Sequence, residues 1–372
     1  MRTRHHSATL PALLIIVGLT AGGRAQASKR TPLAPSPAGW KQAAYIKASN
    51  PSEGDQFGYS VALSRDGNTL AVGAIGEDSN ATGINGDQAN NSANGSGAVY
   101  VFTRSGSTWS QQAYVKSSNT RPNVMFGYSV AVNGNGDTLA VGEFDADRGR
   151  GALYTFGRSD GTWSQQARLQ PKLLSPQDSM GCWVAISDDG NTVVAGALDE
   201  DSLTTGINAV EGGHSGVVDG PDDNSSGAVF GFVRTGTTWS EQVNFKASNS
   251  GKHDWFGIRL ALSGDGNTFA AGAPNEDSAG QGINGKQDDN SADEAGAAYV
   301  YTRSGATWTF RDYMKGAKNA KFDEFGSAVA LNRDGRVLAV GAHFESGGAR
   351  GVNGNQPDKP IPRSGAVYVF TR

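Results

Sequence analysis

The chain has 372 residues, a formal net charge of −4 at pH 7 and a single cysteine, Cys182. One cysteine excludes an intramolecular disulfide, and a mildly acidic chain without a basic cluster argues against nucleic acid as a partner. Glycine accounts for 52 residues without a collagen-like period, about twice its usual share of ~7%. This composition predicts short β-strands joined by many turns.

The N-terminal residues 1–27 have the features of a secretory signal peptide. Basic residues precede an apolar run at 10–19, and small residues surround Ala27, where a signal peptidase would cleave. The run is too short to cross a bilayer as a helix. We expect export to the periplasm or the medium, a flexible leader at 28–39 and one folded domain at 40–372.

A fivefold internal repeat organises that domain. Each unit has a tryptophan, then an aromatic residue or Met followed by Gly, then Asp-Gly or Asn-Gly, then a small apolar block. A closing segment of the type Gly-Ala-Val-Tyr-Val-Phe ends the unit. The tryptophans are Trp40, Trp109, Trp163, Trp239 and Trp308, and the aromatic-Gly pairs begin at Phe57, Phe126, Met180, Phe256 and Phe325.

Each unit is predicted to form four antiparallel strands. In the first unit these are residues 57–64, 69–74, 97–104 and 108–117, and Asp66-Gly67 makes the first hairpin turn. Four-stranded units arranged radially are the blades of a β-propeller, a fold that leaves only short, protected sheet edges.

The order of the strands predicts how the ring closes. The repeat begins with a fourth-type strand at 40–48 and ends with a third-type strand at 365–372. Pairing the two would complete the last blade. The expected fold class is therefore an all-β, five-bladed β-propeller with four antiparallel strands per blade, closed by the N-terminal strand.

These motifs resemble the FG-GAP repeat family, the repeat of integrin α-subunit propellers and of bacterial exported proteins. The fourth unit shows the motif literally, with Phe256-Gly257 followed by Gly272-Ala273-Pro274. The resemblance implies a propeller outside the cytoplasm that often binds Ca²⁺ and recognises proteins or carbohydrates. Two features depart from it: five blades instead of the usual seven, and a hairpin that keeps only Asp66-Gly67 of the family's Asp-x-Asp-x-Asp-Gly loop. One carboxylate cannot supply the six to eight oxygens that Ca²⁺ takes.

Four connections between the second and third strands are long, and they resemble one another. They share an acidic start, Glu-Asp-Ser or similar, and a central Gly-Ile-Asn or Gly-Val-Asn; they are residues 75–96, 198–226, 274–295 and 343–364. Loops longer than about 12–15 residues in a compact domain are usually functional or disordered. Because merely flexible loops need not resemble one another, we expect one ordered conformation, displayed on a single face.

An aspartate stands two residues before the aromatic-Gly pair in every unit with a long loop, and Val124 replaces it in the unit whose connection is short, 144–150. Two interpretations follow: each Asp accepts hydrogen bonds from loop N–H groups, or it helps bind Ca²⁺ with the acidic residues of the loop. The candidate metal ligands are Asp55, Glu77, Asp78, Asp178, Glu200, Asp201, Asp254, Glu276, Asp277 and Asp323.

Two residues break the repeat where first strands should line a central channel. Trp183 and Arg259 replace a serine of sister units, so they are candidate ligand contacts, and idiosyncratic packing is the alternative. The five first strands contain no Asp or Glu, which disfavours a glycosidase. We expect a monomeric, non-enzymatic module for recognition or adhesion that binds a protein or glycan. A structural scaffold and a carbohydrate-active enzyme are the alternatives.

Overall fold

The computed structural model describes residues 41–210, 224–354 and 361–372. The chain divides into two compact units, Met1–Ala43 and Ala44–Arg372, and the strands of the described residues all belong to the second. The predicted signal peptide and leader lie outside the described residues. No helix in the described part of the chain is long and apolar enough to cross a membrane.

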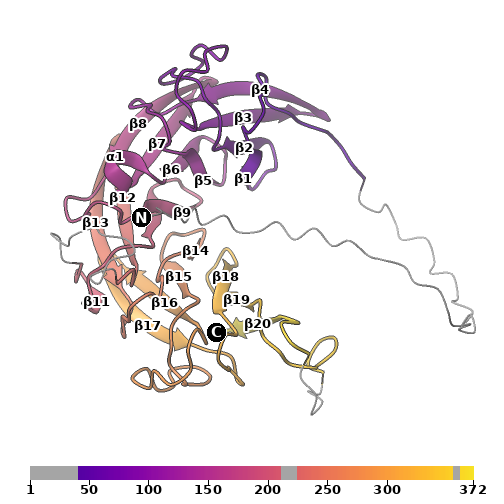
Figure 1. Ribbon diagram of the computed structural model, residues 1–372. Coiled ribbons are helices and arrows are strands. Elements are labelled where there is room, and N and C mark those ends of the chain that lie inside the picture. The colour runs from indigo at the N-terminus through magenta and orange to yellow at the C-terminus, as the bar shows by residue number, and fades with distance from the viewer. Residues whose placement is uncertain (1–40, 211–223, 355–360) are drawn as a thin grey trace, which may run out of the picture. The chain divides into compact units, whose positions relative to one another are not determined.

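Residues 44–372 form five antiparallel sheets (Figure 1). The first sheet has the order β1(Phe57–Leu63), β2(Thr69–Ala74), β3(Ala98–Ser105) and β4(Thr108–Val115). The second and fourth sheets repeat it with β5(Phe126–Val132), β6(Thr138–Glu143), β7(Ala152–Ser159) and β8(Thr162–Leu169), and with β14(Arg259–Leu262), β15(Thr268–Ala273), β16(Ala297–Ser304) and β17(Thr307–Met314). The predicted four-stranded plan is confirmed in these sheets.

The third and fifth sheets vary this plan. The third contains β9(Met180–Ile186), β10(Thr192–Ala197), β12(Ala228–Thr235) and β13(Thr238–Lys246), with the short β11(Gly206–Ile207) added at its outer edge. The fifth has three strands, β18(Phe325–Leu331), β19(Val337–Ala342) and β20(Ala366–Thr371). In Figure 1 the first strand of each sheet lies on the inner side and the fourth strands lie outside.

The hairpin turns follow from their sequence. The Asp66 carboxylate accepts hydrogen bonds from the Ser64 hydroxyl at 2.5 Å and the Asn68 N–H at 3.0 Å. Gly67 takes the left-handed backbone conformation, with φ 67°, that a side chain disfavours. Asp66 therefore organises a turn, as the sequence predicts.

The Gly of each aromatic-Gly pair lets neighbouring sheets approach closely. A Cβ on Gly127, whose φ is 90°, would lie 2.7 Å from the backbone oxygen of Ala98 in the preceding sheet. The Ser60 hydroxyl of the first strand donates to the Gly127 carbonyl at 2.7 Å. First strands therefore pack against the preceding sheet through backbone, which leaves no room for a larger residue.

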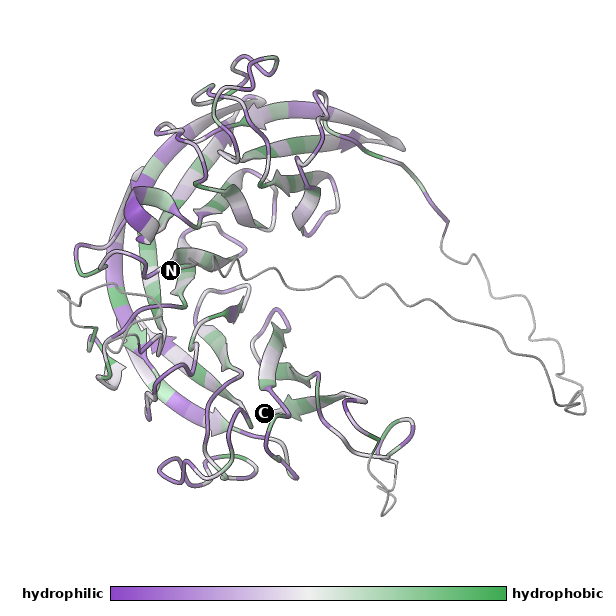
Figure 2. Cartoon of the chain, viewed as in Figure 1, coloured by the Kyte–Doolittle hydropathy of each residue, from purple (hydrophilic) through white to green (hydrophobic). Residues whose placement is uncertain are grey.

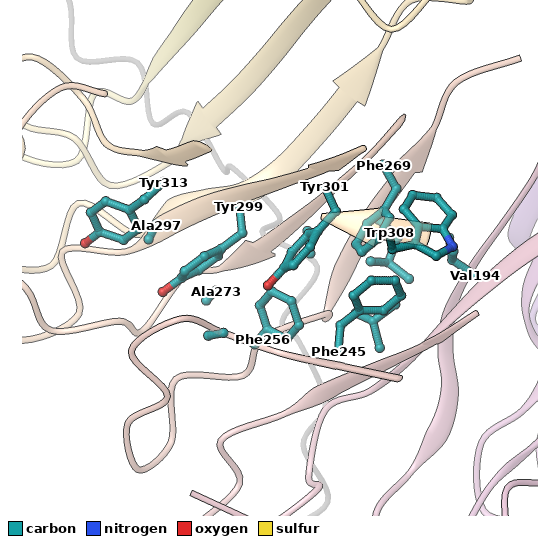
Figure 3. Close-up of a cluster of buried hydrophobic side chains, with 14 of the residues drawn as sticks. Val194, Phe245, Phe256, Phe269, Ala273, Ala297, Tyr299, Tyr301, Trp308 and Tyr313 are labelled. Atoms are coloured by element: carbon teal, nitrogen blue, oxygen red, sulfur yellow. The ribbon is translucent and has the colours of Figure 1, made fainter. Parts of the chain in front are cut away.

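Apolar cores lie between adjacent sheets. The core of the third and fourth sheets brings Phe245, Phe256, Phe269, Tyr301 and Trp308 together (Figure 3). The rings of Phe245 and Trp308 meet edge to face, with centroids 5.5 Å apart. The repeated aromatic residues Phe256 and Trp308 are thus core residues.

The predicted strand pairing at the chain's ends is not present among the described residues. Residues 41–48 have no strand assignment, and within the described part of the chain β20 pairs only with β19. Ile46 and Ala48 instead pack against the first sheet. Ring closure and a blade count of five remain predictions.

Candidate functional site

The long loops and the linkers that enter each first strand lie on one face and interlock. The Asn123 N–H donates to the Asn94 carbonyl at 2.7 Å, and the Met125 N–H donates to the Gly95 carbonyl at 3.1 Å. Trp255 repeats the contact on Ser225, and Glu324 repeats it on Glu294. The loops are largely hydrophilic (Figure 2). The face therefore consists of polar loops held by backbone hydrogen bonds to the linkers.

A buried ion pair anchors the first long loop. The carboxylate of Glu77, 1% exposed, accepts from Lys116 Nζ at 2.7 Å and from the Tyr114 hydroxyl at 2.7 Å. The side-chain amide of Asn50 adds a bond at 3.1 Å. Lys116 is fully buried and also donates to the Ser96 hydroxyl at 2.7 Å. The outer strand β4 thus holds both ends of the loop.

The third and fourth sheets repeat this anchor. Lys246 Nζ pairs with Glu200 and donates to the Ser226 hydroxyl at 2.8 Å. Lys315 Nζ lies 2.5 Å from Glu276, which also accepts from the Tyr313 hydroxyl at 3.0 Å.

Burial sets the electrostatics of these pairs. It lowers the pKa of Lys116, Lys246 and Lys315, while the facing glutamate acts in the opposite direction. A charge removed from water is tolerated in a protein only when paired and hydrogen-bonded. The glutamate that begins each of these loops is therefore a structural partner of lysine.

The central Gly-Ile-Asn adds a short β-bridge to the outer strand. Ile84 bridges to Val115, and Asn85, with φ 55°, exchanges two hydrogen bonds with the backbone of Tyr114 at 2.7 and 2.9 Å. The fourth sheet repeats this with Ile283 on Met314 and Asn284 on Tyr313, and the third with Ile207 on Phe245 and Asn208 on Asn244. The shared motif thus gives these three loops the same bridge to the outer strand.

The linker aspartates cap their own turns. Asp55 Oδ2 accepts the N–H of Ser52 at 2.7 Å, and the other three repeat this with the residue three places earlier: Asp178 with Ser175, Asp254 with Gly251 and Asp323 with Ala320. The loop is contacted by the backbone carbonyl of Asp55, which accepts from Gly76 at 3.1 Å. Val124 supplies an equivalent carbonyl to Asp145 at 3.2 Å, so this loop contact does not need an aspartate.

The second acidic residue of each loop closes the loop on itself. Asp78 Oδ1 accepts the N–H of Gly95 at 2.7 Å, and Asp277 Oδ1 accepts that of Glu294 at 2.8 Å. Asp201 does the same for Ser225 at 2.9 Å. In the described part of the chain, no group of three or more His, Cys, Asp or Glu side chains is arranged to hold a metal ion.

Two linker aspartates give the protein a pH-dependent stability. Burial raises the pKa of Asp178 and of Asp254 to about 8, and the nearby Glu200 and Glu276 add to the effect. The folded state therefore keeps protons that the unfolded chain, with an ordinary aspartate pKa of 3.8, has released. This stability is fully present below pH 3.8 and is lost as the pH rises through about 8.

We expect the free energy of unfolding to fall between pH 5 and pH 8, and Asp254→Asn to weaken that fall. Urea denaturation at several pH values measures both, with the exposed Asp288→Asn as the matched control. Equal pH dependence in the two variants would contradict the assignment.

The unit with the short connection uses different chemistry. Its loop contains α1(Ala146–Gly149), and the buried Glu143 accepts from the Tyr154 hydroxyl at 2.9 Å. Burial raises the pKa of Glu143 to about 7. Gln170 stands where the other complete sheets carry the anchoring lysine, and it donates to the Gly151 carbonyl at 2.8 Å.

The structure brings the two candidate channel residues together. The Arg259 guanidinium lies 4.7 Å from the centre of the Trp183 ring, and Trp183 Nε1 donates to the Leu260 carbonyl at 3.0 Å. Trp183 is 38% exposed. Tyr128 stacks on Phe144 with ring centres 4.5 Å apart. Trp183 and Arg259 thus form a cation–π pair on neighbouring first-strand positions, with the Trp183 ring partly exposed.

Sequence reasoning missed the anchoring lysines. Each follows its unit's tryptophan by seven residues, as Lys116 follows Trp109 and Lys246 follows Trp239. Gln170, seven residues after Trp163, replaces lysine in the sheet with the short loop. The joint presence of lysine and long loop was the signal that could have found them.

The five antiparallel sheets, joined in the same order with equivalent hairpins, define an all-β repeat protein consistent with a β-propeller. The model of the FG-GAP repeat matches residues 40–102 and 109–156, which agrees with the resemblance seen in the sequence. A search of curated proteins finds no match.

Proposed function

We propose that this chain is an exported, non-enzymatic recognition module that binds a protein or glycan through its long loops. The supporting observation is the buried Glu–Lys anchor repeated in three sheets, because a loop held at its base can present a preorganised surface. The tips are rich in exposed side chains that donate and accept hydrogen bonds, such as Asn91, Asp288 and Asn290. FG-GAP repeats of this kind support protein interaction and an extracellular location.

We also propose that the sheets are the blades of a closed, five-bladed propeller. Every first strand but the last packs against the next first strand in the chain, and this arrangement supports a ring. The three-stranded last sheet would then gain its fourth strand from residues near 40–48. A closed ring would place the four long loops around one axis, where a single ligand could contact several of them.

Binding to arrays of glycans and of peptides tests the function. We expect the full chain to bind a defined subset, and the triple variant Asp288→Ala, Asp289→Ala, Asn290→Ala to lose at least about tenfold in affinity, or ~1.4 kcal/mol. Lys318→Ala, exposed and outside the loops, is the control. A chain that binds neither array, or a triple variant that binds as well as the control, would refute the proposal.

Calcium dependence is a separate question. Asp55 Oδ1 and Asp178 Oδ1 are buried without a hydrogen-bond partner among the described residues, and such oxygens can bind a cation. Against this, Lys116 and Lys246 already neutralise the nearest glutamates. We expect thermal melting curves recorded with Ca²⁺ and with a chelator to superimpose. A higher melting temperature with Ca²⁺ that is lost in Asp55→Asn would instead support the linker aspartates as ligands.

A further inference from the structure

The fifth sheet has the glutamate of the anchor and, among the described residues, no cation paired with it. The Glu345 carbonyl accepts the N–H of Gly365 at 2.8 Å, as the Glu77 carbonyl accepts that of Gly97 at 2.8 Å. Glu345 is 6% exposed. The position of Glu345 therefore matches that of Glu77. A buried carboxylate needs a partner of opposite charge, which lysine supplies in the other sheets.

The loop of the fifth sheet also contains residues at the positions that form the β-bridge in the other sheets. Asn353 has φ 52°, close to the 55° of Asn85 and the 54° of Asn284. Val352, in the place of Ile84, is 93% exposed. The segment thus has the conformation that bridges to a fourth strand elsewhere.

The surfaces at the two ends of the repeat are apolar where their equivalents are buried. On β20, Val367 and Val369 are 70% and 64% exposed, whereas Val99 and Val101 of the first sheet are both 0% exposed. On β1, Val61 is 65% exposed, while its equivalent Val130 on β5 is 9% exposed. Such exposed apolar strand faces usually mark an interaction site.

The segment before β1 supplies matching groups. Lys47 follows Trp40 by seven residues, the spacing of the anchoring lysines, and it is exposed. Tyr45, in the position of Tyr114, is 81% exposed. Ile46 packs on the first sheet, just as its equivalent Phe245 packs on the sheet that follows it.

Asn50 holds the end of this segment on the first sheet. Its side chain donates to Glu77 at 3.1 Å and accepts from the Tyr100 hydroxyl at 2.6 Å. Asn249 makes the same pair of contacts with Glu276 and Tyr299 in the fourth sheet. One side of the segment is therefore already placed as in the other units.

We propose that residues 44–47 dock on β20 as the fourth strand of the last sheet, with Lys47 Nζ on the carboxylate of Glu345. The inference rests on the proposed five-bladed ring and specifies its contacts. The register of β3 on β4, with Val99 opposite Val115 and Val101 opposite Ala113, transfers to Ile46 opposite Val367 and Ala44 opposite Val369. Docking also gives Val352 and Asn353 a strand to which they can bridge, as Ile84 and Asn85 bridge to β4.

Disulfide trapping tests the pairing. In a full-length chain with Cys182→Ser, which matches Ser327 at that position of the repeat, Ala44→Cys and Val369→Cys are combined. We expect most molecules to form a disulfide within one chain on mild oxidation, because paired residues lie within disulfide reach. The combination of Ala44→Cys with Thr371→Cys, two residues out of register, should stay reduced. Absence of the first disulfide, or a disulfide between two chains, would overturn the proposal.

Stability of variants tests the ion pair separately. In the open arrangement Lys47 is exposed, so Lys47→Met should be as silent as Lys318→Met. Docking predicts instead that Lys47→Met lowers the urea midpoint about as much as Lys116→Met, and that adding Glu345→Gln restores part of it. A silent Lys47→Met would overturn the proposal. Neither test involves a ligand, so failure of the recognition proposal would leave their results unchanged.

Discussion

Lys116→Met is expected to destabilise the protein by about 3–5 kcal/mol, the typical cost of breaking a buried ion pair by removing one partner. Lys116 is fully buried, and its loss leaves the buried carboxylate of Glu77 without a counter-charge. The methionine side chain roughly fills the space of the lysine stem, so the cost comes from charge and not from a cavity. Urea denaturation of the full chain measures it.

Two variants make this result specific. Lys318→Met removes an exposed lysine and should change stability by less than about 0.5 kcal/mol. Adding Glu77→Gln to Lys116→Met removes the stranded charge and keeps an oxygen that can accept from Tyr114, so part of the loss should return. If the single and double variants are equally unstable, the carboxylate is not the source of the cost.

The repeat made most of the fold predictable. Equivalent spacings require equivalent backbones, and the hairpin at Asp66-Gly67 and the close approach at Gly127 depend on residue types that few alternatives replace. In the first sheet, strand boundaries were therefore predicted to within about two residues from local pattern alone. Pairing between the chain's ends depends on contacts more than 300 residues apart, and local pattern says nothing of how strongly they form.

The candidate site was predicted less well for a related reason. The acidic loop residues were picked out as candidate Ca²⁺ ligands, but Glu77 finds its partner Lys116 39 residues further along the chain, directly after a strand whose polar residues look solvent-exposed in sequence. A single lysine in a strand has no periodicity that marks it as buried. Asp55, in contrast, accepts a hydrogen bond from the backbone N–H three residues earlier. The hydrogen-bond interpretation expected such a bond, but from an N–H of the long loop and not of the linker.

The anchors and the tips of the long loops are built from different residues. The anchors use backbone groups and buried side chains such as Lys315 and Glu276, whereas the side chains of Asp288 and Asn290 at the tip are exposed to solvent. Tip residues such as Asp288 and Asn290 can therefore change without loss of loop conformation. A recognition surface benefits from this separation, because its specificity can vary on a constant frame.

Trp308→Ala is expected to cost about 3–5 kcal/mol, the range for removing a large aromatic side chain from a core. Trp308 is 6% exposed, packs edge to face on Phe269 with centroids 5.3 Å apart, and donates through Nε1 to Gln242 at 3.0 Å. The variant leaves a cavity between the third and fourth sheets and a Gln242 oxygen without its indole partner. Thermal and urea unfolding measure the loss.

Trp183→Ala is the matched control, because it removes the same side chain from an inner strand where 38% of it is exposed. It forfeits one hydrogen bond to Leu260 and the stacking of Arg259, so we expect a cost of about 1 kcal/mol or less. If the two alanine variants lose the same free energy of unfolding, Trp183 contributes as much to core packing as Trp308 does. A small stability cost combined with weaker binding on the glycan or peptide array would place Trp183 in the ligand contact, because an exposed aromatic ring that contributes little to folding is free to serve recognition.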